Sequence, residues 1–152
     1  MRALALDDNL PEAHVAMGRV SLYFDWNLVG AKVSLQRALT LDPRCTAAYS
    51  PTAVCLLGLD EPAQAVELAA RAVAIDPIHI PVRIRYGAML YGARRYQKAI
   101  DEFTEILEFA PEHPMALTWL GCVQDAANEQ AYSSARPAQA EKSVLQRASL
   151  HE

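Results

Sequence analysis

The feature that most constrains this chain is a short phrase that recurs at a fixed distance. Leu41-Asp42-Pro43, Ile75-Asp76-Pro77 and Phe109-Ala110-Pro111 place their prolines 34 residues apart both times. A constant spacing of this size indicates that one supersecondary unit is repeated along the chain. Repeats of this kind form solenoids, in which each unit packs on its neighbours and partners bind along an extended surface.

A series of small residues keeps the same period. Its members are Gly18, Ala53, Gly87 and Gly121, which are separated by 35, 34 and 34 residues. A small residue there lets the first helix of a hairpin approach the second closely, and we expect Ala99 to face Gly87 across this contact. The one additional residue in the first interval predicts a longer turn between the first two helices, around residues 24–27.

Within each unit the pattern of apolar residues is helical. In the third unit, Ile100, Phe103 and Ile106 form one apolar stripe, and charged residues occupy the opposite face. Prolines stand in first turns or directly after a helix, where a missing N–H costs little. The sequence therefore predicts eight helices in four antiparallel hairpins, over residues 11–24, 28–41, 45–58, 62–75, 80–92, 96–109, 114–127 and 137–150.

These units resemble the tetratricopeptide repeat, whose pattern contains Leu-Gly-x2-Tyr, then Ala-x3-Phe, then Pro. The third unit matches best, through Gly87, Ala99, Phe103 and Pro111. The resemblance implies an all-α, right-handed α-solenoid of about four antiparallel helix hairpins. It covers residues 1–152 as a single domain, with units at approximately 11–43, 46–77, 80–111 and 114–150.

Two parts of the sequence depart from the regular period. Residues 2–8 match residues 37–43, the end of a second helix, so residues 1–8 are interpreted as the remnant of a preceding repeat. In the fourth unit, residues 145–148 repeat residues 35–38 eight residues late, which predicts a loop within 126–136. The ends of a solenoid need polar capping. We therefore expect that this chain is a piece of a longer repeat array, or that it pairs end to end with a partner. A short complete protein with a frayed start remains the alternative.

Composition excludes several classes of function. The net charge of −4 argues against nucleic-acid binding, which usually needs a basic face. No apolar stretch approaches the ~18 residues of a membrane helix. The three cysteines, Cys45, Cys55 and Cys122, lack metal-type spacing and are typical of reduced thiols in a cytosolic protein. We therefore expect a cytoplasmic protein that contacts neither membranes nor nucleic acid.

Motifs for catalysis are absent from the sequence. It contains no GxGxxG, Walker or GxSxG motif. His79 and His113 occupy equivalent positions in neighbouring units, and helices packed ~8–10 Å apart hold such side chains too far apart to share a metal easily. The sequence therefore predicts a protein that is not an enzyme and has no catalytic, cofactor-binding or metal-binding residues.

One basic cluster remains open to two interpretations. It consists of Arg83, Arg85, Arg94, Arg95 and Lys98. Such a cluster could bind phosphate or nucleic acid. The acidic residues that follow in positions 101–108 favour the other interpretation, a solvated face of mixed charge.

The resemblance also implies a binding site, because the first helices of tetratricopeptide hairpins line a concave groove. A mostly apolar groove suits an extended peptide or a partner helix, although its apolar residues could instead pack against neighbouring hairpins. A subfamily that clamps the carboxylate end of chaperone tails uses basic and amide side chains here. Only Arg85 matches it, so we do not expect such a clamp. The predicted groove residues are Glu12, Val15, Arg19, Leu22, Tyr23, Ser50, Val54, Leu57, Ile84, Arg85, Ala88, Tyr91, Met115, Thr118 and Cys122.

The predicted function is therefore a scaffold that binds a peptide or partner protein in this groove. The turn Tyr23-Phe24-Asp25-Trp26 resembles one in repeat regions attached to bacterial signalling proteins and transcription regulators, which implies a fragment of a larger signalling or regulatory protein. The alternative is a structural self-assembly module, a homo-oligomer associated through the open ends of its solenoid.

Overall fold

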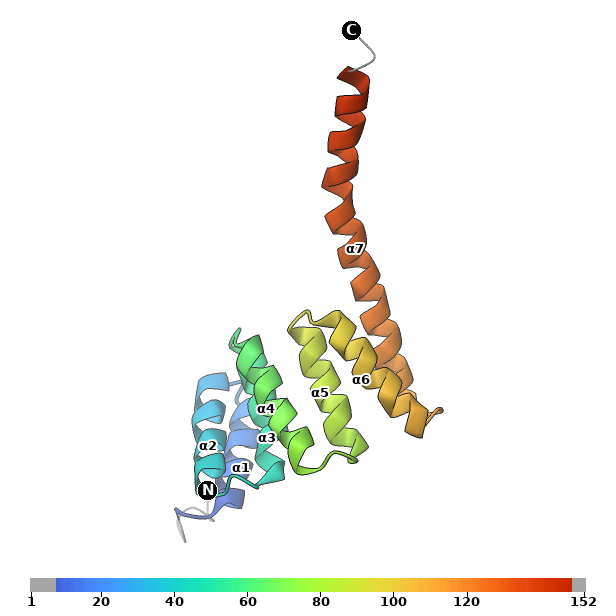
Figure 1. Cartoon of the computed structure of the whole chain (residues 1–152). Coiled ribbons are helices and arrows are strands. Elements are labelled where there is room, and N and C mark those ends of the chain that lie inside the picture. Colours follow the sequence, from blue (N-terminus) through green and yellow to red (C-terminus); the bar gives the residue numbers. More distant parts are fainter. Residues whose placement is uncertain (1–7, 149–152) are drawn as a thin grey trace.

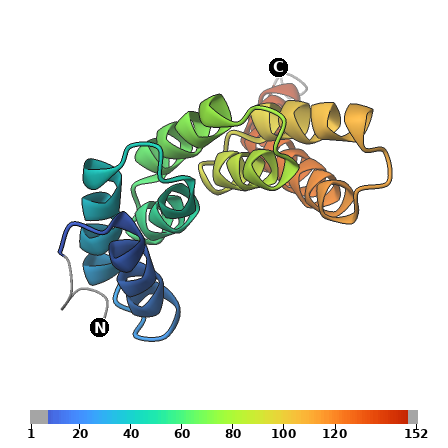
Figure 2. The same ribbon diagram turned by 90° about the horizontal axis from the view of Figure 1, so that it is seen from below.

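The computed structural model describes residues 8–148, and side chains are described up to residue 135. Within this range the chain forms seven α-helices and no strand. Consecutive helices pack against one another along an arc. Figure 2 shows α1, α3, α5 and α7 on the inner side of this arc and α2, α4 and α6 on the outer side. The helices are α1 (Pro11–Tyr23), α2 (Leu28–Leu41), α3 (Thr46–Gly58), α4 (Pro62–Ile75), α5 (Ile80–Gly92), α6 (Tyr96–Phe109) and α7 (Pro114–Ala148).

The predicted all-α solenoid of helix hairpins is confirmed, and the first six helices begin and end within one residue of their predicted bounds. Local chemistry explains several of these starts. Pro11 and Pro62 are the first residues of α1 and α4, where the fixed φ of proline favours a helix. The Asn27 side chain accepts a hydrogen bond of 2.9 Å from the backbone N–H of Gly30 and thereby caps α2.

The turns inside the hairpins repeat with the same period. Trp26, Asp60 and Arg94 all have positive φ, at 53°, 60° and 59°. This left-handed conformation reverses the chain between the two helices of each hairpin. Residues 24–27 connect α1 to α2, whereas residues 59–61 and 93–95 suffice in the next two hairpins. The predicted additional residue in the first turn is therefore confirmed.

The predicted fourth hairpin is wrong. Residues 126–136, for which a loop was predicted, continue the single helix α7 of 35 residues. They contain neither glycine nor proline and are rich in alanine and other good helix formers, and the helix continues through Pro137, which directly follows them. At 1.5 Å per residue α7 is about 52 Å long, and Figure 1 shows it projecting well beyond the other helices. The interpretation of residues 1–7 and the last two residues of the predicted final helix lie outside the described range.

The core consists of two clusters that meet at α3. One cluster joins α1, α2 and α3, the other joins α3 to α7, and Val54 packs against both. Three members of the small-residue series, Gly18, Ala53 and Gly87, are buried in this packing, whereas Gly121 is exposed. A Cβ atom at Gly18 would lie 2.4 Å from Leu35 Cγ, and one at Gly87 would lie 2.5 Å from Phe103 Cζ. At Gly18 the backbone oxygen of Ala31 lies 3.2 Å from this Cβ position, and at Gly87 the nearest atoms belong to the buried Phe103 ring, one helical turn after Ala99.

No helix within residues 8–148 combines the length and the hydropathy that crossing a bilayer requires.

Candidate peptide-binding groove

A pocket of about 170 Å³ opens where α3, α4 and α5 converge, and two of the predicted groove residues, Ser50 and Arg85, line it. Two helices of the inner side form its walls, and the outer helix α4 forms its floor. The pocket is large enough for one side chain of a ligand. Its lining residues are Thr46, Tyr49, Ser50, Ala69, Ala72, Pro81, Val82 and Arg85.

The pocket exists because its floor is made of small residues. Ala69 and Ala72 are buried, and their methyl groups fill little of the space between α3 and α5. The wall beside them is fixed in place. The Tyr49 hydroxyl donates a hydrogen bond of 2.6 Å to the backbone carbonyl of Pro43, and only 7% of Tyr49 is exposed. The cavity is therefore largely preformed, as expected of ligand sites.

Arg85 supplies the charge of this site. Its side chain is exposed, and it makes no hydrogen bond or ion pair with any residue that the structure describes. Ser50 is half-buried on the facing helix α3. The pocket thus combines an apolar floor, a hydroxyl and an unpaired guanidinium, which can hold an apolar side chain next to an acidic group.

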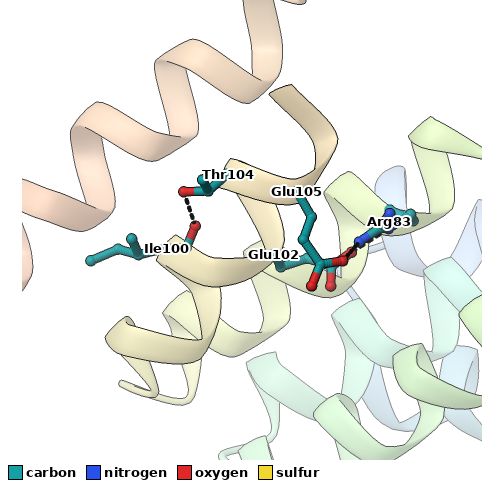
Figure 3. A network of polar contacts seen from close by, with 5 residues as sticks. All are labelled: Arg83, Ile100, Glu102, Thr104 and Glu105. Carbon is teal, nitrogen blue, oxygen red and sulfur yellow. Dashed lines mark hydrogen bonds and ion pairs between the residues drawn. The ribbon is translucent and has the colours of Figure 1, made fainter. Parts of the chain in front are cut away.

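Arg83, two residues earlier on α5, has a different role. Its Nε donates to Glu102 Oε1 and its Nη2 donates to Glu105 Oε2, both at 2.6 Å. Figure 3 shows both carboxylates of α6 directed at this guanidinium. The hydrogen bond that Arg83 donates to Glu102 is the main cause that raises the pKa of Arg83. The Arg83 and Glu102 side chains are 13% and 12% exposed, so this pair joins α5 to α6 and is not free to bind a ligand.

The other predicted groove residues divide by burial. Val15, Leu22, Ile84 and Ala88 are buried in the two core clusters. Val54 and Leu57 are half-buried and pack between hairpins, with Leu57 directly beside Gly92 of α5. The exposed members are Glu12, Arg19, Tyr23, Arg85, Met115, Thr118 and Cys122.

Tyr91 is held by an aromatic cluster at the end of α5. Its ring centroid lies 5.6 Å from that of Trp119 on α7 and 5.8 Å from that of Tyr96 on α6. Trp119 in turn stacks on Phe103, with the centroids 6.1 Å apart. Tyr91 is therefore half-buried, and its ring connects α5 to α6 and α7.

Sequence reasoning missed the floor of the pocket. Ala69 and Ala72 belong to the second helix of their hairpin, whereas the groove prediction considered first helices only. A signal was present, because Ala72 lies 34 residues after Ala38. Two small residues within one turn of α4, opposite the neighbouring hairpin, could have indicated a hollow.

The site contains no cluster suited to a metal. Among the described residues, no group of three or more His, Cys, Asp or Glu side chains could hold an ion. Cys45, Cys55 and Cys122 are free thiols, of which Cys55 is buried and Cys122 is exposed. Burial raises the pKa of the Cys55 thiol, which keeps it protonated.

Sequence comparison finds a curated relative that matches about three quarters of this chain. The chain is 31% identical over 118 residues to the type IV pilus assembly protein PilF of Pseudomonas aeruginosa. The match covers 76% of this chain and 46% of PilF, so the chain spans about half the length of the curated relative that it matches. No protein-family model matches the sequence.

Solved structures show the same fold. The structure of Pseudomonas aeruginosa PilF superposes with a TM-score of 0.66 at 30% identity, covering 82% of this chain and 56% of that one. MamA superposes with a TM-score of 0.71 at 20% identity, covering 84% and 74%. The second tetratricopeptide domain of human RPAP3, in complex with the HSP70 peptide SGPTIEEVD, gives 0.63 at 15% identity and covers 75% and 98%. Together with the 34-residue units, these matches show that the chain has the fold of tetratricopeptide-repeat domains.

Proposed function

We propose that the chain is a non-catalytic scaffold that binds a short peptide segment of a partner protein in the pocket between α3 and α5. The observation that carries the proposal is the unpaired Arg85 at the rim of a preformed apolar pocket. The peptide complex of human RPAP3, which has the same fold, supports it. The preferred ligand has an apolar side chain for the pocket and an acidic residue beside it for Arg85.

The expected affinity of this single site is modest. Burying one aliphatic side chain contributes about 1.5–3 kcal/mol, and an exposed ion pair with Arg85 contributes about 0–1 kcal/mol. These gains are small against the entropy lost on association. Tight binding therefore requires further contacts of the peptide along the inner face of the arc, where Tyr23 and Met115 are exposed.

The test is selection from a displayed peptide library, followed by calorimetric titration of a selected peptide. Arg85→Glu reverses the charge at the pocket, and Ser50→Tyr fills its mouth. Both should weaken binding about tenfold or more. Arg37→Glu is the matched control, because Arg37 is also exposed but lies on the outer helix α2. Selected peptides that bind wild type, Arg85→Glu and Ser50→Tyr equally would overturn the proposal.

A second candidate function, self-association, is favoured by the exposure of Val20. Val20, Cys55, Met89 and Val123 occupy the same position in successive units. The last three are 0%, 4% and 0% exposed because they pack on preceding helices, whereas Val20 is 49% exposed. Nearby Phe24 is 79% exposed, so the first hairpin presents apolar surface of the kind that marks interfaces. Light scattering should show an oligomer that Val20→Glu dissociates; a monomeric wild type would exclude this function.

A further inference from the structure

An open surface depression, separate from the groove pocket, lies at the turn between α5 and α6. Its volume is about 420 Å³, and α7 closes one side of it through Ala127 and Gln130. Three basic side chains line it: Arg94, Arg95 and Lys98. All three are exposed, and none pairs with any residue that the structure describes. The depression therefore gathers three basic side chains that have no ion-pair partner among the described residues, on a chain whose net charge is −4.

The structure divides the basic cluster of the sequence into three parts. Arg83 is neutralised by Glu102 and Glu105 (Figure 3). Arg85 stands at the groove pocket. Arg94, Arg95 and Lys98 gather in one place and form no ion pair with a described residue. Of the acidic residues that follow on α6, Glu102 and Glu105 pair with Arg83, and Asp101 accepts a hydrogen bond from Gln97. None of these three carboxylates is therefore paired with the patch.

Comparison with the preceding repeat shows that the patch opposes helix stability. The residues 34 positions before Arg94 and Arg95 are Asp60 and Glu61, which carry the opposite charge. Acidic residues are favourable at a helix start because the helix dipole is positive there, and basic residues are unfavourable. Arg95 is the N-cap of α6, and no side chain caps that end. Two arginines at the start of α6 therefore do not stabilise the helix. Residues that lower local stability are typical of functional sites.

The backbone conformation of Arg94 adds to this argument. Its φ is 59°, close to the 60° of Asp60. Aspartate and asparagine tolerate this left-handed region better than arginine, since their short polar side chains can hydrogen-bond to the local backbone. Of the three repeats, only the second has aspartate in this conformation; the first has Trp26 with a φ of 53°, and the third has Arg94.

We propose that Arg94, Arg95 and Lys98 bind a short acidic segment of a partner protein. Charge complementarity selects carboxylates, because each guanidinium can hold one through two hydrogen bonds. The size of the patch selects a short segment. One to four turns further along α6 stand Asp101, Glu105 and Glu108, and they would repel a long polyanion such as a nucleic acid. This site is independent of the proposed groove function and can exist without it.

The experiment measures fluorescence anisotropy of a labelled octaglutamate peptide with the full chain. Octaglutamate should bind wild type at low ionic strength and bind more weakly as salt rises. The double variant Arg94→Asp/Arg95→Glu installs the residues of the preceding repeat. It should weaken binding about tenfold or more, while its melting temperature stays equal to that of wild type or rises. Retained stability ensures that lost binding does not reflect unfolding.

Arg37→Glu is again the matched control, because it also removes an exposed cation but lies on α2, away from the depression. It should leave the affinity for octaglutamate unchanged. The proposal is overturned if wild type does not bind octaglutamate, or if Arg37→Glu weakens binding as much as the double variant. It is also overturned if a single-stranded oligonucleotide of equal charge binds more tightly and loses its binding in the double variant, since the partner is then a nucleic acid.

Discussion

Two glycines in the same repeat position should respond in opposite ways to the same substitution. A Cβ atom at Gly87 would lie 2.5, 2.8 and 2.9 Å from three atoms of the Phe103 ring, whereas a Cβ atom at Gly121 would meet nothing within 4 Å. The difference arises because α7 has no second helix packed on this face, where α6 covers Gly87. Gly87→Leu and Gly121→Leu are therefore a matched pair.

The magnitudes follow from two opposing terms. Replacing glycine by leucine inside a helix contributes about 0.8 kcal/mol through helix propensity at both positions. At Gly87 the added side chain must also displace Phe103, which is 0% exposed and held by dense packing. Overpacking of this kind costs about 1–3 kcal/mol or more, and such close approach to a rigid ring places Gly87→Leu at the upper end. The expected net loss is about 2 kcal/mol at Gly87, against a gain of about 1 kcal/mol at Gly121.

The assay is thermal unfolding followed by far-ultraviolet circular dichroism. For a chain of this length 1 kcal/mol shifts the melting temperature by about 2–4 °C. Gly87→Leu should therefore lower it by about 4–8 °C, and Gly121→Leu should raise it by about 2–4 °C. If both variants shift in the same direction, or if Gly87→Leu melts like wild type, the assignment of Phe103 to the space beside Gly87 is refuted.

Three further predictions concern an ion pair, a thiol and a cap. Arg83→Ala should lower the free energy of unfolding by about 1–3 kcal/mol in a denaturant titration, because Glu102, 12% exposed, loses its partner. A thiol reagent should modify exposed Cys122 and spare buried Cys55 in the folded chain. Since burial raises the pKa of Cys55 above 9.0, its contribution to stability is present below pH 9 and falls as pH rises through the folded-state pKa. Asn27→Ala should cost about 0.5–2 kcal/mol in thermal unfolding, because it removes the cap of α2.

The first three hairpins could be predicted closely because their information is local and repeated. The Leu-Asp-Pro phrases end the second helices, and the apolar stripes give the helical period. The fourth hairpin failed for a related reason. Residues 145–148 repeat a helical motif, but a repeated motif alone cannot close a hairpin. A turn needs a signal that ends the preceding helix, and residues 126–136 contain none.

The candidate site could be predicted only in part, because it depends on distances between helices. The sequence suggested Ser50 and Arg85, and the structure places both at one pocket. The sequence alone could not distinguish the paired Arg83 from the unpaired Arg85, since the partners of Arg83 lie 19 and 22 residues away. The same limit applies to Ile84 and Ala88, whose burial is decided by the packing of neighbouring hairpins.

The period that defines the scaffold also provides an internal standard for finding function. At each repeat position, the units that share a residue type show what the fold requires. Where one unit has a different residue that lowers stability, we infer that binding, and not folding, requires that residue. At the turn inside each hairpin, the first two units have neutral or acidic residues, Trp26-Asn27 and Asp60-Glu61, and only the third unit has two cations, Arg94 and Arg95. Val20 keeps its apolar type but is 49% exposed. Because solenoid units share one packing geometry, such departures point to ligands and interfaces and not to the fold itself.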